Sequence, residues 1–377
     1  MVLWEARPGR RPGLVVIRPY GAASRQGPSA GDAHSLKNDK GMAMRLRLSD
    51  IMAAANRISG VADATPLVPS PFLSHLAGVD VLLKLELAQP IGAFKLRGAL
   101  NAIRQLEDVP GVTCCSTGNH GRGVAFAARE KGLKAVICMS ELVPQAKVEG
   151  IRALGAEVLV AGRSQDEAQQ AAERLVAEAG YAEISPFDDP AVIAGQGTIG
   201  LEMLAARPDI ATILVPLSGG GLAGGVALAA KAINPRIRVI GISMDRGAAM
   251  HASLAAGHPV EVEEVPSLAD SLGGGIGIDN RLSFALCREL LDDTVLVTEE
   301  EIYRAMQALY YEDRLVAEGA CVVGIAALQA GKIEIGQGPV ATILTGRNLD
   351  MAVFTRVVTG QDVVLGDYTV KGHPYGA

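Results

Sequence analysis

Lys95 is a lone lysine in a setting that suits covalent chemistry. An apolar run, Val81–Leu87, precedes it, and an alanine-rich helical pattern begins at the lysine and continues to Leu106. An amine at a helix N-terminus between Phe94 and Leu96 is disfavoured in its charged form by desolvation and by the positive end of the helix dipole. A lysine with a lowered pKa can form a Schiff base with an aldehyde. The alternative is an ordinary first-turn lysine whose amine reaches water.

A second polar segment, Ser116–Gly121, follows the predicted strand Val112–Cys115 and precedes a helix. Its small residues expose several backbone N–H groups at a helix N-terminus, which suits the binding of a carboxylate. The side-chain amide of Asn119 can also donate a hydrogen bond to a ring oxygen. An ordinary strand-to-helix turn in which His120 has a local partner is the other interpretation.

A third segment, Ser218–Ala223, is rich in glycine and lies between a predicted strand and a predicted helix. Glycines allow the backbone to close on a phosphate, which the N–H groups and the helix dipole then hold. The spacing of Gly219, Gly221 and Gly224 also matches a dinucleotide fingerprint, with Asp245 roughly where a ribose-binding acid would stand. This pattern alone leaves a single phosphate and a dinucleotide both open.

A fourth polar segment, Thr345–Asn348, follows the apolar run Val340–Leu344. A hydroxyl at the end of a buried strand can face the nitrogen of a pyridine ring. A polar turn is the more common role of such residues.

The length and composition of the chain exclude several classes of protein. The 377 residues are enough for two subdomains with a large core. A formal net charge of −6 argues against a nucleic-acid partner. The five cysteines include no CxxC pair and the six histidines no zinc spacing, so we expect a reduced, cytoplasmic protein without a metal site. No apolar run approaches the roughly 20 residues of a membrane span.

Apolar runs alternate with amphipathic stretches from Ser49 onward, which predicts a mostly parallel sheet covered by helices on both faces. Ser49 and Asp50 are expected to cap a first helix ending at Ile58. Met1–Ala43 is basic and lacks a persistent period, so it is predicted to be a disordered extension. The other predicted strands are Ala135–Met139, Glu157–Val160, Ile213–Leu217 and Arg238–Ile242, and the other predicted helices are Gly123–Lys131, Lys147–Leu154, Ser164–Ala179, Leu222–Ile233 and Glu299–Leu309.

Taken together, the four segments resemble the fold-type II pyridoxal-phosphate enzymes of the threonine/serine dehydratase group, over about Leu48 to Arg356. The resemblance implies two open, mostly parallel twisted sheets with helices on both faces. It implies a cofactor-binding domain of residues 44–110 and 190–357, a small substrate-loop domain of residues 111–189, and a C-terminal tail of residues 358–377. The implied cofactor is pyridoxal 5'-phosphate.

The resemblance also implies a role for individual residues. Lys95 would carry the cofactor and act in catalysis with Thr117 and Glu318. Phe94, Asn119, Ser218, Gly219, Gly220, Gly221, Leu222 and Thr345 would bind the cofactor with Lys95, and Ser116, Thr117, Asn119, His120 and Arg347 would bind substrate.

The implied reaction is an elimination. Lys95, displaced by the substrate amine, would remove the α-proton of a β-hydroxy α-amino acid, and loss of the β-hydroxyl would lead to a 2-oxo acid and ammonia. The neutral hydroxyl of Thr345 would leave the pyridine nitrogen largely unprotonated. We expect a homodimer or homotetramer with a small-molecule substrate.

Within the group, the chain looks closest to the hydroxyectoine-utilisation dehydratases, on the stretches Ser116–Arg122, Ser243–His251 and Asp270–Gly275. Arg347 and Ser271 stand where the wider family usually has glycine, and Ser243 where metal-dependent serine racemases carry a glutamate. A catabolic threonine/serine dehydratase or a 3-hydroxyaspartate dehydratase is the nearest alternative. A nicotinamide-binding oxidoreductase and a non-catalytic ligand-binding relative are the more distant alternatives.

Overall fold

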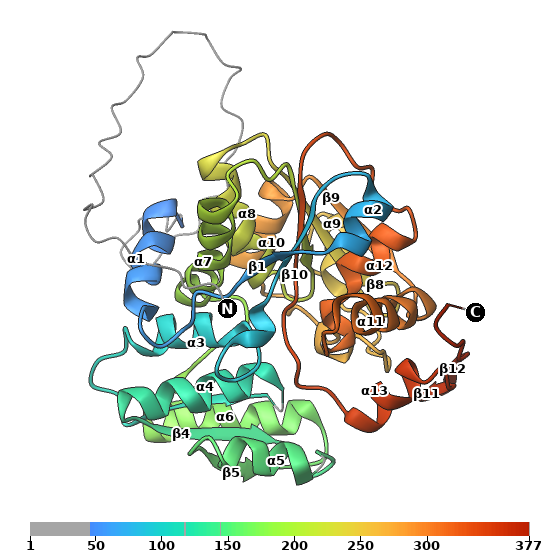
Figure 1. Cartoon of the computed structure of the whole chain (residues 1–377). Helices are drawn as coiled ribbons and strands as arrows, with labels where there is room; N and C mark the ends of the chain where they lie inside the picture. Colours follow the sequence, from blue (N-terminus) through green and yellow to red (C-terminus); the bar gives the residue numbers. More distant parts are fainter. Residues whose placement is uncertain (1–45, 117, 144, 377) are drawn as a thin grey trace, which may run out of the picture. The chain divides into compact units, whose positions relative to one another are not determined.

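The computed structural model of the protein describes residues 46–116, 118–143 and 145–376. In this part of the chain, strands and helices alternate and form two separate sheets of mainly parallel strands (Figure 1). The expected α/β class is therefore confirmed. The predicted N-terminal extension, Met1–Ala43, lies outside the described residues.

The larger sheet has six strands in the order β1-β2-β10-β7-β8-β9. All neighbours are parallel except β1, which runs antiparallel to β2 at one edge. Because parallel strands end at the same edge of a sheet, the segments that follow β2, β7 and β10 are brought together. The strands are β1 Leu67–Pro69, β2 Val81–Lys84, β7 Thr212–Pro216, β8 Arg238–Met244, β9 Asp293–Val297 and β10 Val340–Ile343.

Side chains alternate between the two faces of this sheet and pack into two different cores. Val81 and Leu83 join the cluster that also contains Ile325 of α12, whereas Leu82 joins the cluster around Val226 of α8. Helices therefore cover both faces, as the alternation of apolar runs predicted. The helices of this region are α2 Pro71–Ala77, α8 Gly221–Ile233, α9 Ala249–Ala256, α10 Leu282–Leu290, α11 Glu299–Asp313, α12 Val323–Gln329 and α13 Met351–Val358.

The smaller sheet has four parallel strands in the order β5-β4-β3-β6, with α4, α5 and α6 beside them (Figure 1). All of its strands lie within residues 111–189, the range expected for a small domain. The strands are β3 Gly111–Cys115, β4 Lys134–Met139, β5 Glu157–Val160 and β6 Ala182–Glu183, and the helices are α4 Asn119–Lys131, α5 Gln145–Arg152 and α6 Gln165–Ala179.

Helix α3 (Lys95–Ile103) packs against both α4 and α7 (Pro190–Ala206). The contact between α3 and α7 requires glycine, since a Cβ on Gly195 would lie 2.6 Å from the carbonyl oxygen of Arg97. This close packing holds the start of α3, and with it Lys95, against a buried helix.

The structure corrects several sequence expectations. The apolar run Val81–Leu87 is a strand only to Lys84 and then forms a short 3₁₀ turn, Glu86–Ala88. Helix α3 ends at Ile103 rather than at Leu106. Helix α1 is Leu48–Ile58, so it begins one residue before Ser49.

Residues 358–377 were expected to form only a tail. They contain an antiparallel pair of strands, β11 Val363–Leu365 and β12 Tyr368–Val370. Val363 and Val370 are buried in the same core as α12, so apolar burial holds this segment against that helix and its neighbours.

Candidate active site

Lys95 is the first residue of α3, at the carboxyl edge of the large sheet, and its side chain is partly buried. Its Nζ donates a hydrogen bond of 2.6 Å to the carbonyl oxygen of Pro186 and lies 5.4 Å from the centre of the Phe94 ring. Desolvation lowers the pKa of Lys95 to about 8, from the usual 10.5. About a tenth of the amine is therefore neutral and nucleophilic at pH 7, far more than for an ordinary lysine.

The segment after β10 is hydrogen-bonded to the segment that precedes Lys95. The N–H of Phe94 donates to the carbonyl oxygen of Thr345 at 2.9 Å, and the N–H of Arg347 donates to that of Gly92 at 2.9 Å. Thr345 itself is 3% exposed, at the carboxyl end of the strand. The backbone thus places the Thr345 hydroxyl and the Lys95 amine at one edge of the sheet.

Asn119 and Glu318 form a buried pair although they are 199 positions apart in the sequence. The amide nitrogen of Asn119 donates to both carboxylate oxygens of Glu318, at 2.9 and 3.2 Å. The amide oxygen of Asn119 accepts a hydrogen bond of 2.7 Å from Asn348. Gly346 packs directly on the carboxylate, because a Cβ at that position would lie 2.6 Å from Glu318 Oε1.

The pKa of Glu318 is raised to about 7: burial raises it most, the hydrogen bond from Asn119 lowers it, and the nearby Asp270 raises it. No ion pair with Glu318 occurs within the described ranges. A carboxyl group that titrates near neutral pH can exchange protons with a ligand, which is typical of acid–base residues in active sites.

The glycine-rich loop follows β7 and opens α8. The N–H of Gly224 donates to the carbonyl oxygen of Gly220, the N-cap of α8. The N–H groups of the first helical turn before Gly224 can therefore bind a ligand. A Cβ on Gly219 would lie 2.2 Å from the ring of Phe187, and Gly220 has a φ of +85°. The loop therefore requires glycine for space and for its backbone conformation.

Pro186 and Phe187 connect the loop to the lysine. The Pro186 carbonyl accepts the hydrogen bond from Lys95, and the next residue, Phe187, packs on Gly219 and Gly221. Pro186 and Phe187 therefore lie between the glycine-rich loop and the Lys95 amine.

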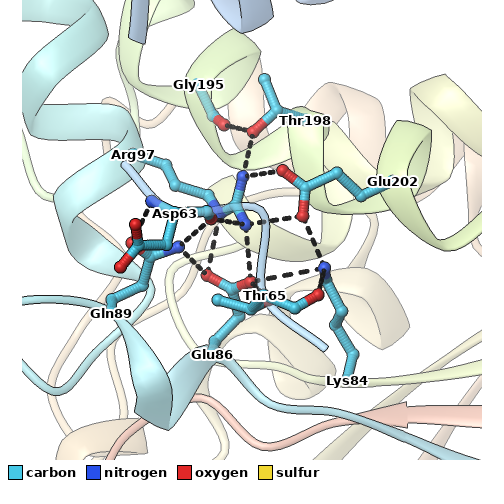
Figure 2. A network of polar contacts seen from close by, with 9 residues as sticks. All are labelled: Asp63, Thr65, Lys84, Glu86, Gln89, Arg97, Gly195, Thr198 and Glu202. Carbon is cyan, nitrogen blue, oxygen red and sulfur yellow. Dashed lines mark hydrogen bonds and ion pairs between the residues drawn. The ribbon is translucent and has the colours of Figure 1, made fainter. Parts of the chain in front are cut away.

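Arg97, two residues after Lys95, is the centre of a second buried polar cluster (Figure 2). Its guanidinium is 1% exposed and donates to both carboxylate oxygens of Glu86, at 2.8 Å each, and to both of Glu202, at 2.6 and 2.8 Å. Lys84 forms an ion pair with Glu202, so two cations meet two carboxylates. This arrangement holds the first turn of α3 in place.

Comparison with known proteins decides the family. The family model described as "Pyridoxal-phosphate dependent enzyme" matches residues 58–346 of the chain. The chain is a member of this family. A putative threonine dehydratase from Sinorhizobium fredii is 54% identical over 318 residues, which is 84% of this chain and 96% of that protein.

Two further comparisons agree. The L-threonine ammonia-lyase of Thermotoga maritima is 40% identical over 316 residues, 83% of this chain and 78% of the relative. The structure of maize serine racemase superposes with a TM-score of 0.78 at 33% identity, covering 82% of this chain and 96% of that one. The protein is a pyridoxal-phosphate-dependent enzyme of the threonine dehydratase-like ammonia-lyase kind, and the nicotinamide alternative is thereby wrong.

The described residues fit the cofactor. The glycine-rich loop offers backbone N–H groups to a phosphate, and its close contacts with Phe187 require glycine at Gly219 and Gly221. Lys95 offers an amine of lowered pKa to an aldehyde. Thr345 offers a buried hydroxyl to the ring nitrogen, and the amide of Asn119 can donate to the ring hydroxyl. These assignments remain predictions for each residue.

The remaining predicted residues are placed differently. His120 is buried, and its Nε2 lies 2.7 Å from the carbonyl oxygen of Ile184. Desolvation, with Lys95 adding to it, lowers the pKa of His120 to about 3, so the ring is neutral at neutral pH. The Ser116 hydroxyl accepts from the N–H of Gly118 at 3.4 Å. Thr117 lies outside the described residues.

Arg347 is exposed, and its side chain passes over Gly92, where a Cβ would lie 3.2 Å from the Arg347 Cγ. In the loop, Ser218 is partly buried, and Leu222 is 7% exposed and packs in the α8 core. Within the described ranges, no group of three or more histidine, cysteine or acidic side chains could hold a metal ion. Likewise, no helix there is long and apolar enough to cross a membrane.

Sequence reasoning missed Pro186, Phe187 and Cys321, which contact the predicted site. The proline and phenylalanine stand between a two-residue strand and a helix whose N-cap is Asp189, and an apolar loop of this kind carries no motif. The cap followed by Pro190 was the only available indication that a helix starts there.

Proposed function

We propose that the enzyme removes the β-hydroxyl and α-amino groups from a β-hydroxy α-amino acid and releases a 2-oxo acid and ammonia. The observation that carries the proposal is the position of Lys95: a partly buried amine with a pKa of about 8, held by Pro186 beside the glycine loop. The bound cofactor supplies an acceptor for the negative charge that develops at the α-carbon.

Lys95 is the proton acceptor in this proposal. At a pH near its pKa, about half of the lysine is neutral and able to take the α-proton. The Pro186 carbonyl accepts a hydrogen bond and thereby fixes the direction of the amine. The ring of Phe94, whose centre lies 5.4 Å from the amine, is an apolar neighbour of it.

The α-carboxylate of the substrate is proposed to bind where α4 begins. Ser116, Thr117 and His120 belong to this segment, and the N–H groups of the first helical turn favour an anion. His120 is proposed to support the segment through its bond to Ile184, because its neutral ring contributes no charge.

Arg347 and Ser271 are proposed to select the substrate. Arg347 has no ion pair in the described part of the chain, and its side chain passes over Gly92, in the segment that precedes Lys95. A free guanidinium can bind a second carboxylate or another polar extension. A larger or more polar amino acid than threonine is therefore the proposed substrate, with a compound derived from hydroxyectoine as the candidate.

Threonine is the second candidate. The relatives that are 54% and 40% identical carry threonine in their names, which favours this simpler activity. For either substrate, we propose a cytoplasmic enzyme. We also propose that it is a homodimer or homotetramer, and light scattering of the purified enzyme would test this oligomeric state.

Kinetics on four substrates test the proposal. We expect kcat/KM for ring-opened hydroxyectoine or 3-hydroxyaspartate to exceed that for threonine and serine by about tenfold, a difference of about 1.4 kcal/mol. A kcat/KM for threonine above the values for the other substrates would support a catabolic threonine dehydratase instead. Release of no 2-oxo acid from any of them would exclude the elimination itself.

A further inference from the structure

Cys321 is a buried cysteine that no predicted role accounts for. It ends the 3₁₀ turn η3, Gly319–Cys321, that begins after Glu318, and its side chain is fully buried. Its Sγ lies 3.2 Å from the hydroxyl oxygen of Thr345. It also lies 2.8 Å from both the N–H nitrogen and the carbonyl oxygen of Gly346.

The Cys321 thiol can accept hydrogen bonds but has only one proton to donate. The N–H of Gly346 donates to the sulfur, so the sulfur is an acceptor once. The thiol has one proton to give, and the oxygens within reach are those of Thr345 and Gly346. The Gly346 oxygen already accepts a hydrogen bond from the N–H of Glu318 at 3.2 Å. It has a second lone pair, and it lies nearer the sulfur than the Thr345 oxygen does, at 2.8 Å against 3.2 Å, so the thiol donates to Gly346.

The position of the Thr345 hydroxyl depends on this sulfur. The two hydrogen bonds with Gly346 fix the sulfur in place, and the Thr345 hydroxyl lies against it at 3.2 Å. If the thiol is removed, the hydroxyl loses the group that holds its orientation. Burial raises the pKa of the Cys321 thiol strongly, so the sulfur keeps its proton at neutral pH.

We propose that Cys321 is a positioning residue: its thiol is hydrogen-bonded to the backbone of Gly346 and its sulfur contacts the Thr345 hydroxyl, and together these contacts hold that hydroxyl at the ring nitrogen of the cofactor. The inference rests on the proposed function, which places Thr345 at that nitrogen. Cys321 does not touch the cofactor in this account and acts through Thr345.

The turn that carries Cys321 also carries Glu318, which adds a geometric argument. The N–H of Cys321 donates to the Glu318 carbonyl at 2.9 Å, and both residues contact Gly346. Gly346 in turn pairs with Ala93, two residues before Lys95. One short turn thus carries both the sulfur that contacts the Thr345 hydroxyl and the Glu318 carboxyl.

The test compares Cys321→Ala, Cys321→Ser, Thr345→Ala and the double variant Cys321→Ala/Thr345→Ala. The readouts are the absorption and fluorescence of the bound cofactor and its dissociation constant, with the melting temperature of the apoprotein measured beside them. Cys138→Ala, another fully buried cysteine, which lies in β4, is the control for loss of a buried thiol.

We expect Cys321→Ala to shift the cofactor absorption band and to weaken cofactor binding about fivefold, the effect of one hydrogen bond. Cys321→Ser should restore most of both, because a hydroxyl also donates. In the Thr345→Ala background, Cys321→Ala should change neither quantity further. The Cys138→Ala control should keep the parent's spectrum.

Three results would overturn the inference. The first is a Cys321→Ala enzyme with the parent's spectrum and cofactor affinity. The second is an equal effect of Cys321→Ala with and without Thr345, which would show a packing role. The third is a Thr345→Ala enzyme with the parent's spectrum, which would show that Thr345 does not contact the cofactor ring. Absence of a violet band in the parent enzyme would instead contradict the proposed function.

If Cys321→Ala lowers the melting temperature so far that the apoprotein is unfolded, Cys321→Val fills the volume without a donor. That variant should then show the spectral shift and Cys321→Ser should not. The same shift in both would overturn the inference.

Discussion

Two buried polar clusters flank the segment that carries Lys95, and they differ in charge balance. The Arg97 cluster sets Arg97 and Lys84 against Glu86 and Glu202 (Figure 2). The other cluster joins Glu318 to the neutral side chain of Asn119. In the first cluster the carboxylate of Glu202 has a lowered pKa, whereas in the second the pKa of Glu318 is raised to about 7.

The two clusters therefore have different roles: one stabilises the fold, and the other can take part in proton transfer. A carboxylate paired with a guanidinium stays ionised and is inert, so the Arg97 cluster fixes the helix. A buried carboxyl without a cation changes its protonation state near neutral pH, so it can take part in a reaction.

Replacing Arg97 by methionine should break the balanced cluster. Glu86, which is fully buried, would lose its guanidinium partner, and an uncompensated buried charge costs about 3–5 kcal/mol. Denaturant unfolding of the apoprotein measures this loss. Arg129→Met is the matched control, because Arg129 is exposed and lies over the Phe126 ring at 5.1 Å.

We expect the Arg129→Met control to lose less than about 1 kcal/mol. Equal losses in the two variants would contradict the role given to the Arg97 cluster. They would mean that the buried ion pairs contribute no more to folding than a surface contact does.

Replacing Glu318 by glutamine should remove a pH-dependent part of the stability. The folded-state pKa, about 7, lies above the usual 4.5, so the contribution is present below pH 4.5 and is lost as pH rises through 7. A pKa moved from 4.5 to about 7 corresponds to about 3 kcal/mol. Unfolding of the apoprotein at pH 5 and pH 8 should therefore show a larger loss for the parent than for Glu318→Gln.

Glu130→Gln, which removes an exposed carboxyl from α4, is the control for the change in net charge. A parent and a Glu318→Gln variant that lose the same stability between the two pH values would show that Glu318 is not the titrating group. Its assignment to acid–base chemistry would then lose its physical basis.

Replacing Arg347 by glycine should have the smallest effect on folding and a selective effect on activity. The side chain is exposed, so we expect the free energy of unfolding to change by less than about 0.5 kcal/mol. The preference for a polar substrate over threonine should fall by about tenfold, as expected for loss of one charged contact. An unchanged ratio of the kcat/KM values would show that Arg347 does not contact substrate.

The ends of the buried strands could be predicted from the sequence because apolar runs and the polar residues after them are local patterns. β5 has the predicted bounds, and Lys95 and Thr345 follow strands whose parallel pairing brings them together. These features depend on periodicity of two or 3.6 and on turn residues, which a single sequence displays.

Other parts of the fold could not be predicted because tertiary contacts determine them. Helix α7 is buried on most sides and contains Gly195, Gly197 and Gly200, so it shows neither an amphipathic face nor high helix propensity. The Arg97 cluster joins residues up to 118 positions apart, and no local pattern connects Lys84 to Glu202. The pairing of Cys321 with Thr345 is hidden in the same way.

The most direct test of the account is to locate the lysine that carries the cofactor. Borohydride makes the link between pyridoxal phosphate and its lysine permanent, and peptide mapping by mass spectrometry then identifies the residue. We predict that the label is found on Lys95 in the parent enzyme and is absent from Lys95→Ala, which should be inactive. A label on another lysine, such as the buried Lys84, or bound cofactor with no labelled lysine at all, would contradict the assignment of the active site.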